Sequence, residues 1–324
     1  MDDPLPPFEL PVPDLGRWRA GNTGVEGVWR FDSGAPGREV LVTALIHGNE
    51  LCGAWALKTA LDAGLHPRRG ALTLALCNLA AFDRFDAADF GASRCVDQDL
   101  NRVWGAMGWR AAPGTIEQRR ALELLPFAER ADWLLDLHSM HNPGPPLVLT
   151  GLQRRNIELA RELGAPALVV ADAGHAEGAR LRDHGRWGRA GDDGSRSLLV
   201  ECGFHGELAA REVALDMLGR FLCAAGSLDE ADLPAGWLRP RPAAQAVQTV
   251  LEVTEAVTAK EGEAPRFAAR WATGQRIAAA GTLLGWNAGQ PFATPYDDCT
   301  LVMPSLRNVR PGLTIVRLAR DARI

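Results

Sequence analysis

The sequence lacks the features of a secreted, membrane-spanning or nucleic-acid-binding protein. No apolar run approaches the roughly 20 residues that span a bilayer, and the first residues carry neither the basic nor the apolar segment of a secretion signal. The six cysteines are scattered without a CxxC pair, which predicts reduced thiols. The net charge of -5 argues against a general nucleic-acid binder. We expect a cytoplasmic globular protein with no nucleic-acid or membrane partner.

What the chain does contain, up to residue 235, is an alternation of apolar strands and helices. The predicted strands are residues 25–31, 39–46, 71–77, 132–137, 167–170 and 197–200. The predicted helices are residues 50–63, 115–131, 156–163 and 207–225. Short apolar strands that alternate with helices predict an α/β domain whose mostly parallel sheet is covered on both faces.

The pattern changes after residue 235. Pro234, Pro240 and Pro242 indicate a linker, and short β-type runs separated by glycine and proline follow it. The sequence shows no convincing helix there. We therefore expect two domains, an α/β domain at residues 1–235 and a small all-β domain at residues 236–324.

Side chains suited to a metal centre follow two of the predicted strands. His47 and Glu50 come directly after residues 39–46, and His138 follows residues 132–137. Two histidines and a glutamate, with one position left for water, are a ligand set of catalytic zinc hydrolases. Simpler readings stay open: an H-x-x-E pattern also arises when a glutamate begins a helix, and His138 also fits a core histidine. His141 is a rival for the third position.

Glu201 ends a third predicted strand, residues 197–200. Burying a lone carboxylate is costly, so this side chain has to be paired, ligating or catalytic. As a base it would take a proton from a metal-bound water and return it to a leaving amine. The alternative is a structural ion pair with a nearby arginine. In a parallel sheet the site lies at the carboxyl ends of the strands, where His47, His138 and Glu201 are all expected.

The long polar stretch of residues 78–109 contains Arg94, Asn101 and Arg102. A loop of this length in a compact domain is usually functional. A guanidinium can grip a carboxylate with two hydrogen bonds or stabilise an oxyanion. The alternative for any single arginine is a plain surface charge.

Four motifs together resemble one known family. They are His47-Gly48-Asn49-Glu50, Asp99-Leu100-Asn101-Arg102, Leu137-His138 and Val200-Glu201-Cys202-Gly203. Their order and approximate spacing are similar to those of the succinylglutamate desuccinylase/aspartoacylase family, which belongs to the zinc carboxypeptidase superfamily.

The resemblance implies a fold, a cofactor and a reaction. The fold would be a carboxypeptidase-like three-layer α/β/α domain with a parallel or mixed sheet, and the C-terminal β domain would cap its active site. One zinc ion per chain would be held by His47, Glu50 and His138, and Glu201 would be the general acid/base. The reaction would be hydrolysis of a small N-acyl amino acid at its amide bond.

Further roles that the resemblance implies concern the substrate. Arg94 stands where the family has its carbonyl-polarising arginine. Asn101 and Arg102 stand where the family binds the α-carboxylate of the product. Tyr296, the only tyrosine of the chain, is a candidate to cover the substrate, with an ordinary surface-turn tyrosine as the alternative.

The sequence departs from the family pattern at two points. Cys52, Cys95 and Cys202 neighbour the site motifs, and we interpret them as small buried residues and not as ligands. The arginine that holds a second substrate carboxylate in aspartoacylase has no clear counterpart. The candidates for that role are Arg180, Arg182, Arg186, Arg189 and Arg196.

Two other functions stay open at this point. A zinc carboxypeptidase for peptides or peptidoglycan stems would use the same metal site, with Asn101 and Arg102 on the peptide C-terminus. A non-catalytic binding protein derived from the family is the other alternative. The resemblance also makes a homo-oligomer plausible.

Overall fold

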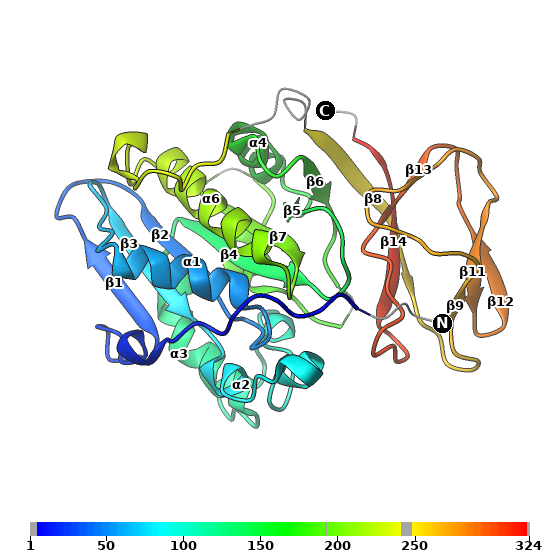
Figure 1. Cartoon of the computed structure of the whole chain (residues 1–324), viewed down its shortest axis with the longest axis horizontal. Coiled ribbons are helices and arrows are strands. Elements are labelled where there is room, and N and C mark those ends of the chain that lie inside the picture. The colour runs from blue at the N-terminus through cyan, green and yellow to red at the C-terminus, as the bar shows by residue number, and fades with distance from the viewer. Residues whose placement is uncertain (1–4, 176, 192, 241–247, 323–324) are drawn as a thin grey trace.

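The structure is a computed structural model that describes residues 5–175, 177–191, 193–240 and 248–322. Its framework is a mixed sheet of eleven strands in the order β1-β3-β2-β4-β7-β5-β6-β8-β14-β13-β10 (Figure 1). These strands are β1 Val28–Asp32, β2 Glu39–Ala44, β3 Ala71–Leu76, β4 Trp133–Met140, β5 Leu147–Leu149, β6 Leu168–Ala171, β7 Arg196–Phe204, β8 Thr249–Thr258, β10 Arg276–Ile277, β13 Cys299–Val302 and β14 Thr314–Asp321. A second, antiparallel sheet has the order β12-β11-β9 and consists of β9 Arg266–Phe267, β11 Leu283–Asn287 and β12 Gln290–Ala293.

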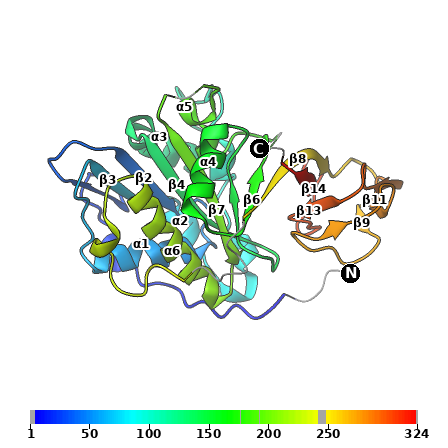
Figure 2. The ribbon, with the colours of Figure 1, turned by 90° about the horizontal axis from the view of Figure 1, so that it is seen from above.

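Helices cover both faces of the first part of the main sheet. The α-helices are α1 Leu51–Asp62, α2 Leu79–Phe82, α3 Ile116–Arg130, α4 Arg154–Leu163, α5 Gly185–Gly188 and α6 Leu208–Ala224. The 3-10 helices are η1 Gly16–Trp18, η2 Ala87–Ser93, η3 Leu100–Arg102, η4 Leu181–Asp183 and η5 Glu230–Asp232. Figure 2 shows α1 and α6 on one face of the sheet and α3 and α5 on the other.

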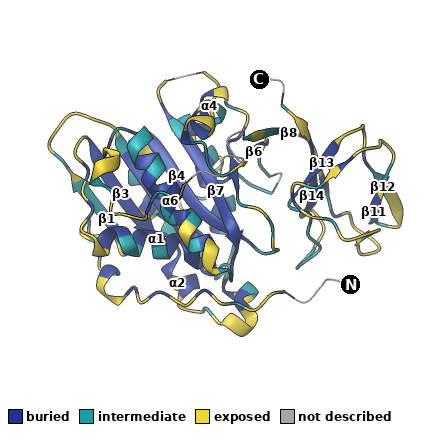
Figure 3. Ribbon diagram, turned by 45° about the horizontal axis from the view of Figure 1, so that its top comes forward, coloured by how far each residue is buried: buried dark blue, intermediate teal, exposed yellow. Residues whose placement is uncertain are grey.

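Two hydrophobic clusters lie between the sheet and its two helix layers. One joins the sheet to α1, α4 and α6, and the other joins it to α3 and α5. The central strands are buried, whereas the outer faces of the helices are exposed (Figure 3). The expected three-layer α/β/α fold is thus confirmed. Its sheet is mixed, because β1 and β5 run antiparallel to their neighbours β3 and β7.

Local signals in the sequence predict several helix ends correctly. Thr115 is the N-cap of α3, and its hydroxyl accepts a hydrogen bond from the backbone N–H of Gln118 at 3.1 Å. Gly164 follows α4 with a φ of 65°, a left-handed conformation that glycine adopts without strain. Both residues form their helix ends by local contacts, which explains why the sequence alone reveals them.

Strand ends differ more from expectation. β4 continues to Met140 and β7 continues to Phe204, since the two strands keep pairing beyond the apolar runs that predict them. His138 and Glu201 therefore lie within strands and not just after them. The sequence does not predict the short strand β5, whose three residues are too few to show a pattern.

The C-terminal part consists of strands within residues 248–322, as expected. Its first strand, β8, pairs in parallel with β6, so the main sheet runs on into this part. Pro242, one of the predicted linker residues, lies outside the described residues. The division into domains at residue 235 stays a prediction.

Candidate active site

The turn after β2 brings two candidate ligands to the start of α1. Leu45 has a φ of 56°, and Gly48 lies so close to the next segment that a Cβ atom there would sit 2.4 Å from the backbone of Ala81 and Phe82. Only glycine allows this close approach. Glu50 is the N-cap residue of α1. The turn thereby holds the side chains of His47 and Glu50 next to each other.

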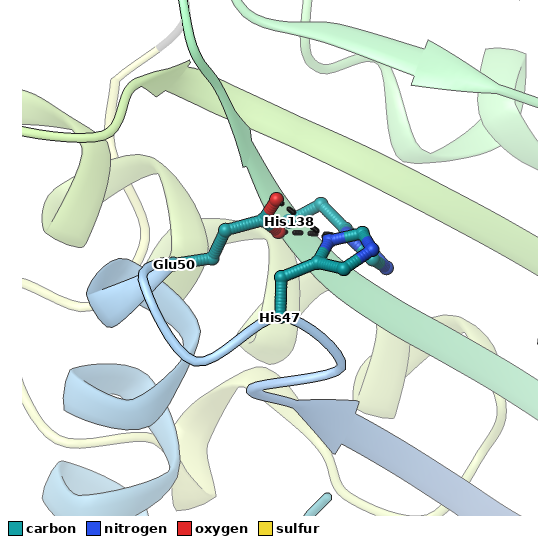
Figure 4. Close-up of side chains that lie close together, drawn as sticks. All are labelled: His47, Glu50 and His138. Carbon is teal, nitrogen blue, oxygen red and sulfur yellow. Dashed lines mark hydrogen bonds and ion pairs between the residues drawn. The ribbon is translucent and has the colours of Figure 1, made fainter. Parts of the chain in front are cut away.

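His47, Glu50 and His138 converge as one buried group. Within the described residues, they are the set of histidine, cysteine and acidic side chains suited to hold a metal ion, with ligand atoms within 4.8 Å of one another. The Glu50 carboxylate lies between the two rings, with Oε1 2.8 Å from His47 Nδ1 and Oε2 2.7 Å from His138 Nδ1 (Figure 4). The backbone N–H of Ser139 also donates to Glu50 Oε2, at 3.2 Å.

Each of the two imidazoles has a carboxylate next to its outer nitrogen, Nε2. His47 Nε2 is 2.9 Å from Asp99 Oδ1, and His138 Nε2 is 2.9 Å from Asp136 Oδ2. Thr43 donates from its hydroxyl to the other oxygen of Asp136, at 2.6 Å. Metal-binding histidines commonly have such a carboxylate on the outer nitrogen, which orients the ring and raises its basicity.

The donor set fits a zinc ion. When the outer nitrogens carry the protons, both Nδ1 atoms are lone-pair acceptors, as are the two oxygens of Glu50. Four acceptor atoms that face one another require protons or a cation between them. Burial opposes a charged imidazole, yet Asp136 and Glu50 raise the pKa of His138 well above its ordinary value. Nitrogen and oxygen donors of this kind suit zinc.

Glu201 stands beside this group. It is the register partner of His138 in the parallel pair β4–β7. It is 8% exposed, and its Oε2 has no hydrogen-bond partner among the described residues. Burial, together with the Glu50 carboxylate, raises the pKa of Glu201 to about 8. A carboxylate with a pKa near neutrality can both accept and return a proton.

The loop of residues 78–109 brings further predicted residues to the same place. Arg94 donates from Nη2 to Asp99 Oδ2 at 2.9 Å, and its Nη1 lies 3.7 Å from Glu50 Oε1. Arg102 Nη1 lies 3.8 Å from Asp99 Oδ2. Asn101 is buried, and its side-chain oxygen accepts from the backbone N–H of Leu181 at 2.8 Å. Asp99 thus ties Arg94, Arg102 and His47 together.

His141 and the cysteines stand apart from the ligand group. His141 contacts the rings of Phe90 and His205. Cys52 is buried and donates to the carbonyl of His138 at 3.4 Å, and Cys202 is buried as well. Cys52 and Cys202 are thus buried as expected, whereas Cys95 is only partly buried. The ligand group includes His138 and not His141.

Tyr296 lies in the C-terminal part. Its ring packs on the hydrophobic cluster that contains Val316 and Leu318, and its hydroxyl is 2.6 Å from that of Thr254. The structure groups it with this cluster and not with the metal ligands. A role over the substrate stays a prediction.

The five candidate arginines separate into two kinds. Arg180 and Arg182 are fully buried, and both pair with Asp183. Arg186 pairs with Asp132 at the opposite end of β4, Arg189 is exposed after α5, and Arg196 begins β7. Arg180 and Arg182 therefore differ from the other candidates, because they are buried near the loop that carries Arg102.

A cavity of about 680 Å³ lies between the residues after β4 and the C-terminal part. Its lining includes His141, Trp271 and Met303. Asn142 joins the two sides, because its side chain donates to Pro304 O and accepts from Arg307 Nε. Burial, with Arg307 and Arg94, lowers the pKa of His141 to about 4, so this ring is neutral. The cavity reaches Met140 at the end of β4, and none of His47, Glu50 and His138 lines it.

Sequence reasoning missed three residues near the site. Asp136 precedes His138 by two positions on one strand, so period-two alternation was a usable signal for it. His175 and Arg317 lie 142 positions apart, yet Arg317 Nη2 is 3.0 Å from His175 Nε2. No local pattern reveals such a contact.

This α/β fold presents a buried His47, Glu50 and His138 group of the kind that holds a metal ion in hydrolases. Residues 36–214 match the succinylglutamate desuccinylase/aspartoacylase catalytic domain. The chain belongs to the succinylglutamate desuccinylase/aspartoacylase family, a family of amide hydrolases. None of the curated protein sequences compared with the chain matches it.

Solved structures share the fold at low sequence identity. Succinylglutamate desuccinylase from Vibrio cholerae is 15% identical with a TM-score of 0.65, over 92% of this chain and 86% of that one. A succinylglutamate desuccinylase/aspartoacylase from Rhodobacter sphaeroides is 18% identical with a TM-score of 0.62, over 90% of this chain and 87% of that one. The ectoine utilization protein EutE from Ruegeria pomeroyi, solved with product bound, is 17% identical with a TM-score of 0.60, over 88% and 86%.

The helices of the described residues are all too short or too polar to cross a bilayer.

Proposed function

We propose that this protein is a zinc-dependent hydrolase that cleaves the amide bond of a small N-acyl amino acid. The observation that carries the proposal is the buried group of His47, Glu50 and His138 beside Glu201. Its acceptor atoms suit one zinc ion per chain, and its outer carboxylates orient both rings. A bound zinc ion would lower the pKa of a water molecule and polarise the substrate carbonyl.

Each nearby residue has a role that follows from its position. Glu201 is the general acid/base, because its free Oε2 and raised pKa suit the transfer of a proton from water to the leaving amine. Arg94 is held by Asp99 with its guanidinium near Glu50, where it would stabilise negative charge on the carbonyl oxygen.

Arg102 and Asn101 would bind the α-carboxylate of the amino acid. Arg102 Nε is buried without a hydrogen-bond partner among the described residues, so this guanidinium has donors to spare. Asn101 fixes the loop through Leu181 and sets the position of its neighbour Arg102.

A substrate panel with matched variants tests the proposal. The purified protein is loaded with zinc, its metal content is measured, and N-acetyl and N-succinyl amino acids are compared with short peptides. We expect one zinc ion per chain and release of a free amino acid from the N-acyl compounds. A chain that takes up no zinc, or that cleaves only peptides, would contradict the proposal.

A further inference from the structure

Glu117 is a buried carboxylate on α3 that the proposed function leaves without a role. It is the second residue of the helix, and 0% of its surface is exposed. An acidic residue in the first turn of a helix is favoured by the helix dipole and can stay in water. Burying it is costly unless hydrogen bonds replace the lost water. The hydrogen-bond partners of Glu117 therefore indicate why it is buried.

Four donors surround the Glu117 carboxylate, and three of them are consecutive backbone N–H groups of one loop. Oε1 accepts from Val96 at 2.6 Å, and Oε2 accepts from Asp97 at 3.1 Å and from Gln98 at 3.2 Å. The fourth donor is the side-chain amide of Asn78, which donates to Oε1 at 3.1 Å. Successive backbone N–H groups that converge on one point bind anions well. Here the anion is a side chain of the same protein.

The loop also holds the helix. The Asp97 carboxylate accepts a hydrogen bond at 2.8 Å from the backbone N–H of Ile116, the residue before Glu117. An N–H group in the first turn of a helix has no partner within the helix, so the loop supplies one. These reciprocal contacts fix the loop relative to α3 in both position and orientation.

The loop that is fixed in this way leads directly into the proposed site. Arg94 precedes the three N–H groups and Asp99 follows them. Asp99 lies 2.9 Å from His47 Nε2 and accepts from Arg94 Nη2 at 2.9 Å. Arg102 is three residues further on, with its Nη1 3.8 Å from Asp99 Oδ2. A shift of the loop would therefore move the carboxylate beside a metal ligand and both proposed substrate arginines together.

We propose that Glu117 is a positioning residue for the candidate active site. This rests on the proposed function. Its carboxylate holds residues 96–98 so that Asp99 orients the His47 ring and the two arginines keep their places. The hydrogen bonds of Glu117 go to the loop and to Asn78, so it acts through the loop and not on the substrate itself.

Glu117→Gln tests the link between the carboxylate and the loop. The variant keeps the shape of the side chain but replaces one acceptor oxygen by a donor, which leaves buried N–H groups of the loop unpaired. We expect hydrogen exchange of residues 94–102, measured by mass spectrometry, to become about tenfold faster than in the wild type. Unchanged exchange of this segment overturns the proposal.

Zinc affinity, measured by competition with a chelator, tests the link between the loop and the site without any substrate. Glu117→Gln should weaken it about 3- to 10-fold, less than Asp99→Asn, which removes the outer carboxylate itself. Because Glu117 acts through Asp99, the double variant should bind zinc no more weakly than Asp99→Asn alone. Losses that simply add would overturn the proposal.

Steady-state kinetics separate positioning from a loss of folded protein. A merely structural role lowers the active fraction, so that kcat falls while KM stays at the wild-type value. Misplacement of Arg94 and Arg102 should instead lower kcat and raise KM, with a loss in kcat/KM of about 10- to 100-fold. An unchanged KM in zinc-loaded Glu117→Gln would indicate the structural role and overturn the proposal.

The matched control is Glu129→Gln, because Glu129 lies on the same helix but is exposed, 3.8 Å from Arg110. It should leave exchange, zinc affinity and kinetics unchanged. Glu117→Asp keeps the charge on a side chain one methylene shorter and should lie between the wild type and Glu117→Gln; it carries the test if Glu117→Gln does not fold. If no N-acyl amino acid is hydrolysed, the proposed function fails, and the exchange and zinc measurements still decide the role of Glu117.

Discussion

The metal-ligand group and the arginine group of Arg180 and Arg317 around Asp172 are both buried, yet one is rich in acceptor atoms and the other in donors. Around Glu50, the two Nδ1 atoms and the carboxylate oxygens are acceptors without enough donors. Around Asp172, guanidinium donors outnumber the acceptors. The first arrangement suits a cation, whereas in the second two guanidiniums share one carboxylate. The Glu201 carboxylate interacts electrostatically with Glu50 of the first group and with Arg317 of the second.

The two groups are also built differently. Every ligand of the first group comes from β2, its following turn, or β4, and these strands are direct neighbours. The second group joins residues of the loop after β6 to a strand near the end of the chain. The metal group depends on a local arrangement, whereas the arginine group depends on how the C-terminal part packs on the catalytic part.

Removing the metal ligands should have the largest effect. The double variant His47→Ala/His138→Ala should bind no zinc and show no hydrolysis, since a single carboxylate does not hold the ion. Metal analysis and activity assays measure this. His66→Ala, which removes an exposed histidine outside the site, is the control and should keep both. Activity without bound zinc in the double variant would contradict the role of this group.

Glu201→Gln should have the next largest effect. The amide cannot accept a proton, so kcat should fall by about 10²- to 10⁴-fold, while zinc content stays at the wild-type level. Steady-state kinetics and metal analysis measure the two quantities. Glu212→Gln, in an exposed part of α6, should leave both unchanged. If Glu201→Gln lost zinc together with activity, Glu201 would instead be part of the metal site.

Asp136→Asn tests whether the outer carboxylates support the metal group. Losing the charge behind His138 should weaken zinc binding about 10- to 100-fold, as measured by competition with a chelator. Asp216→Asn is the matched control, because Asp216 is also buried but pairs with Arg220 on α6, away from the ligands. An equal loss in both variants would indicate a general effect on stability and not a role in orienting the ring.

Tyr296→Phe should have the smallest effect. The hydroxyl contacts Thr254 in the C-terminal part, so we expect less than about a threefold change in KM and kcat, as measured with the best substrate of the panel. A much larger rise in KM would show instead that Tyr296 covers the substrate. The result decides whether Tyr296 takes part in substrate recognition.

Much of the fold could be predicted because its signals are local. The strand and helix alternation up to residue 235 follows from runs of apolar residues, and the ends of α3 and α4 follow from Thr115 and Gly164. The lengths of β4 and β7 could not be predicted, since they depend on pairing between distant strands. The same holds for β8, whose pairing with β6 extends the main sheet into the C-terminal part.

The same distinction between local signals and long-range contacts applies to the candidate site. The turn with His47 and Glu50 and the strand with His138 carry their chemistry in short motifs, and parallel pairing of β2 and β4 brings them together. Choosing Arg180 and Arg182 among five arginines required burial, which the sequence does not record. Arg317 had no signal at all, because its partners Asp172 and His175 lie on another part of the chain.

By itself, then, the sequence determined the α/β class, the family and the residues that can hold a metal. Short local motifs show the ligand side chains and the order of the strands. Only the tertiary structure decided which carboxylates lie next to the outer nitrogens of the histidines, and that Arg317 of the C-terminal strand contacts Asp172 and His175. The physical reason is that charge balance in a buried site is a sum over residues from the whole chain. β14 brings Arg317 Nε to 3.5 Å from Asp172 Oδ2, and only the folded chain places these two charges together.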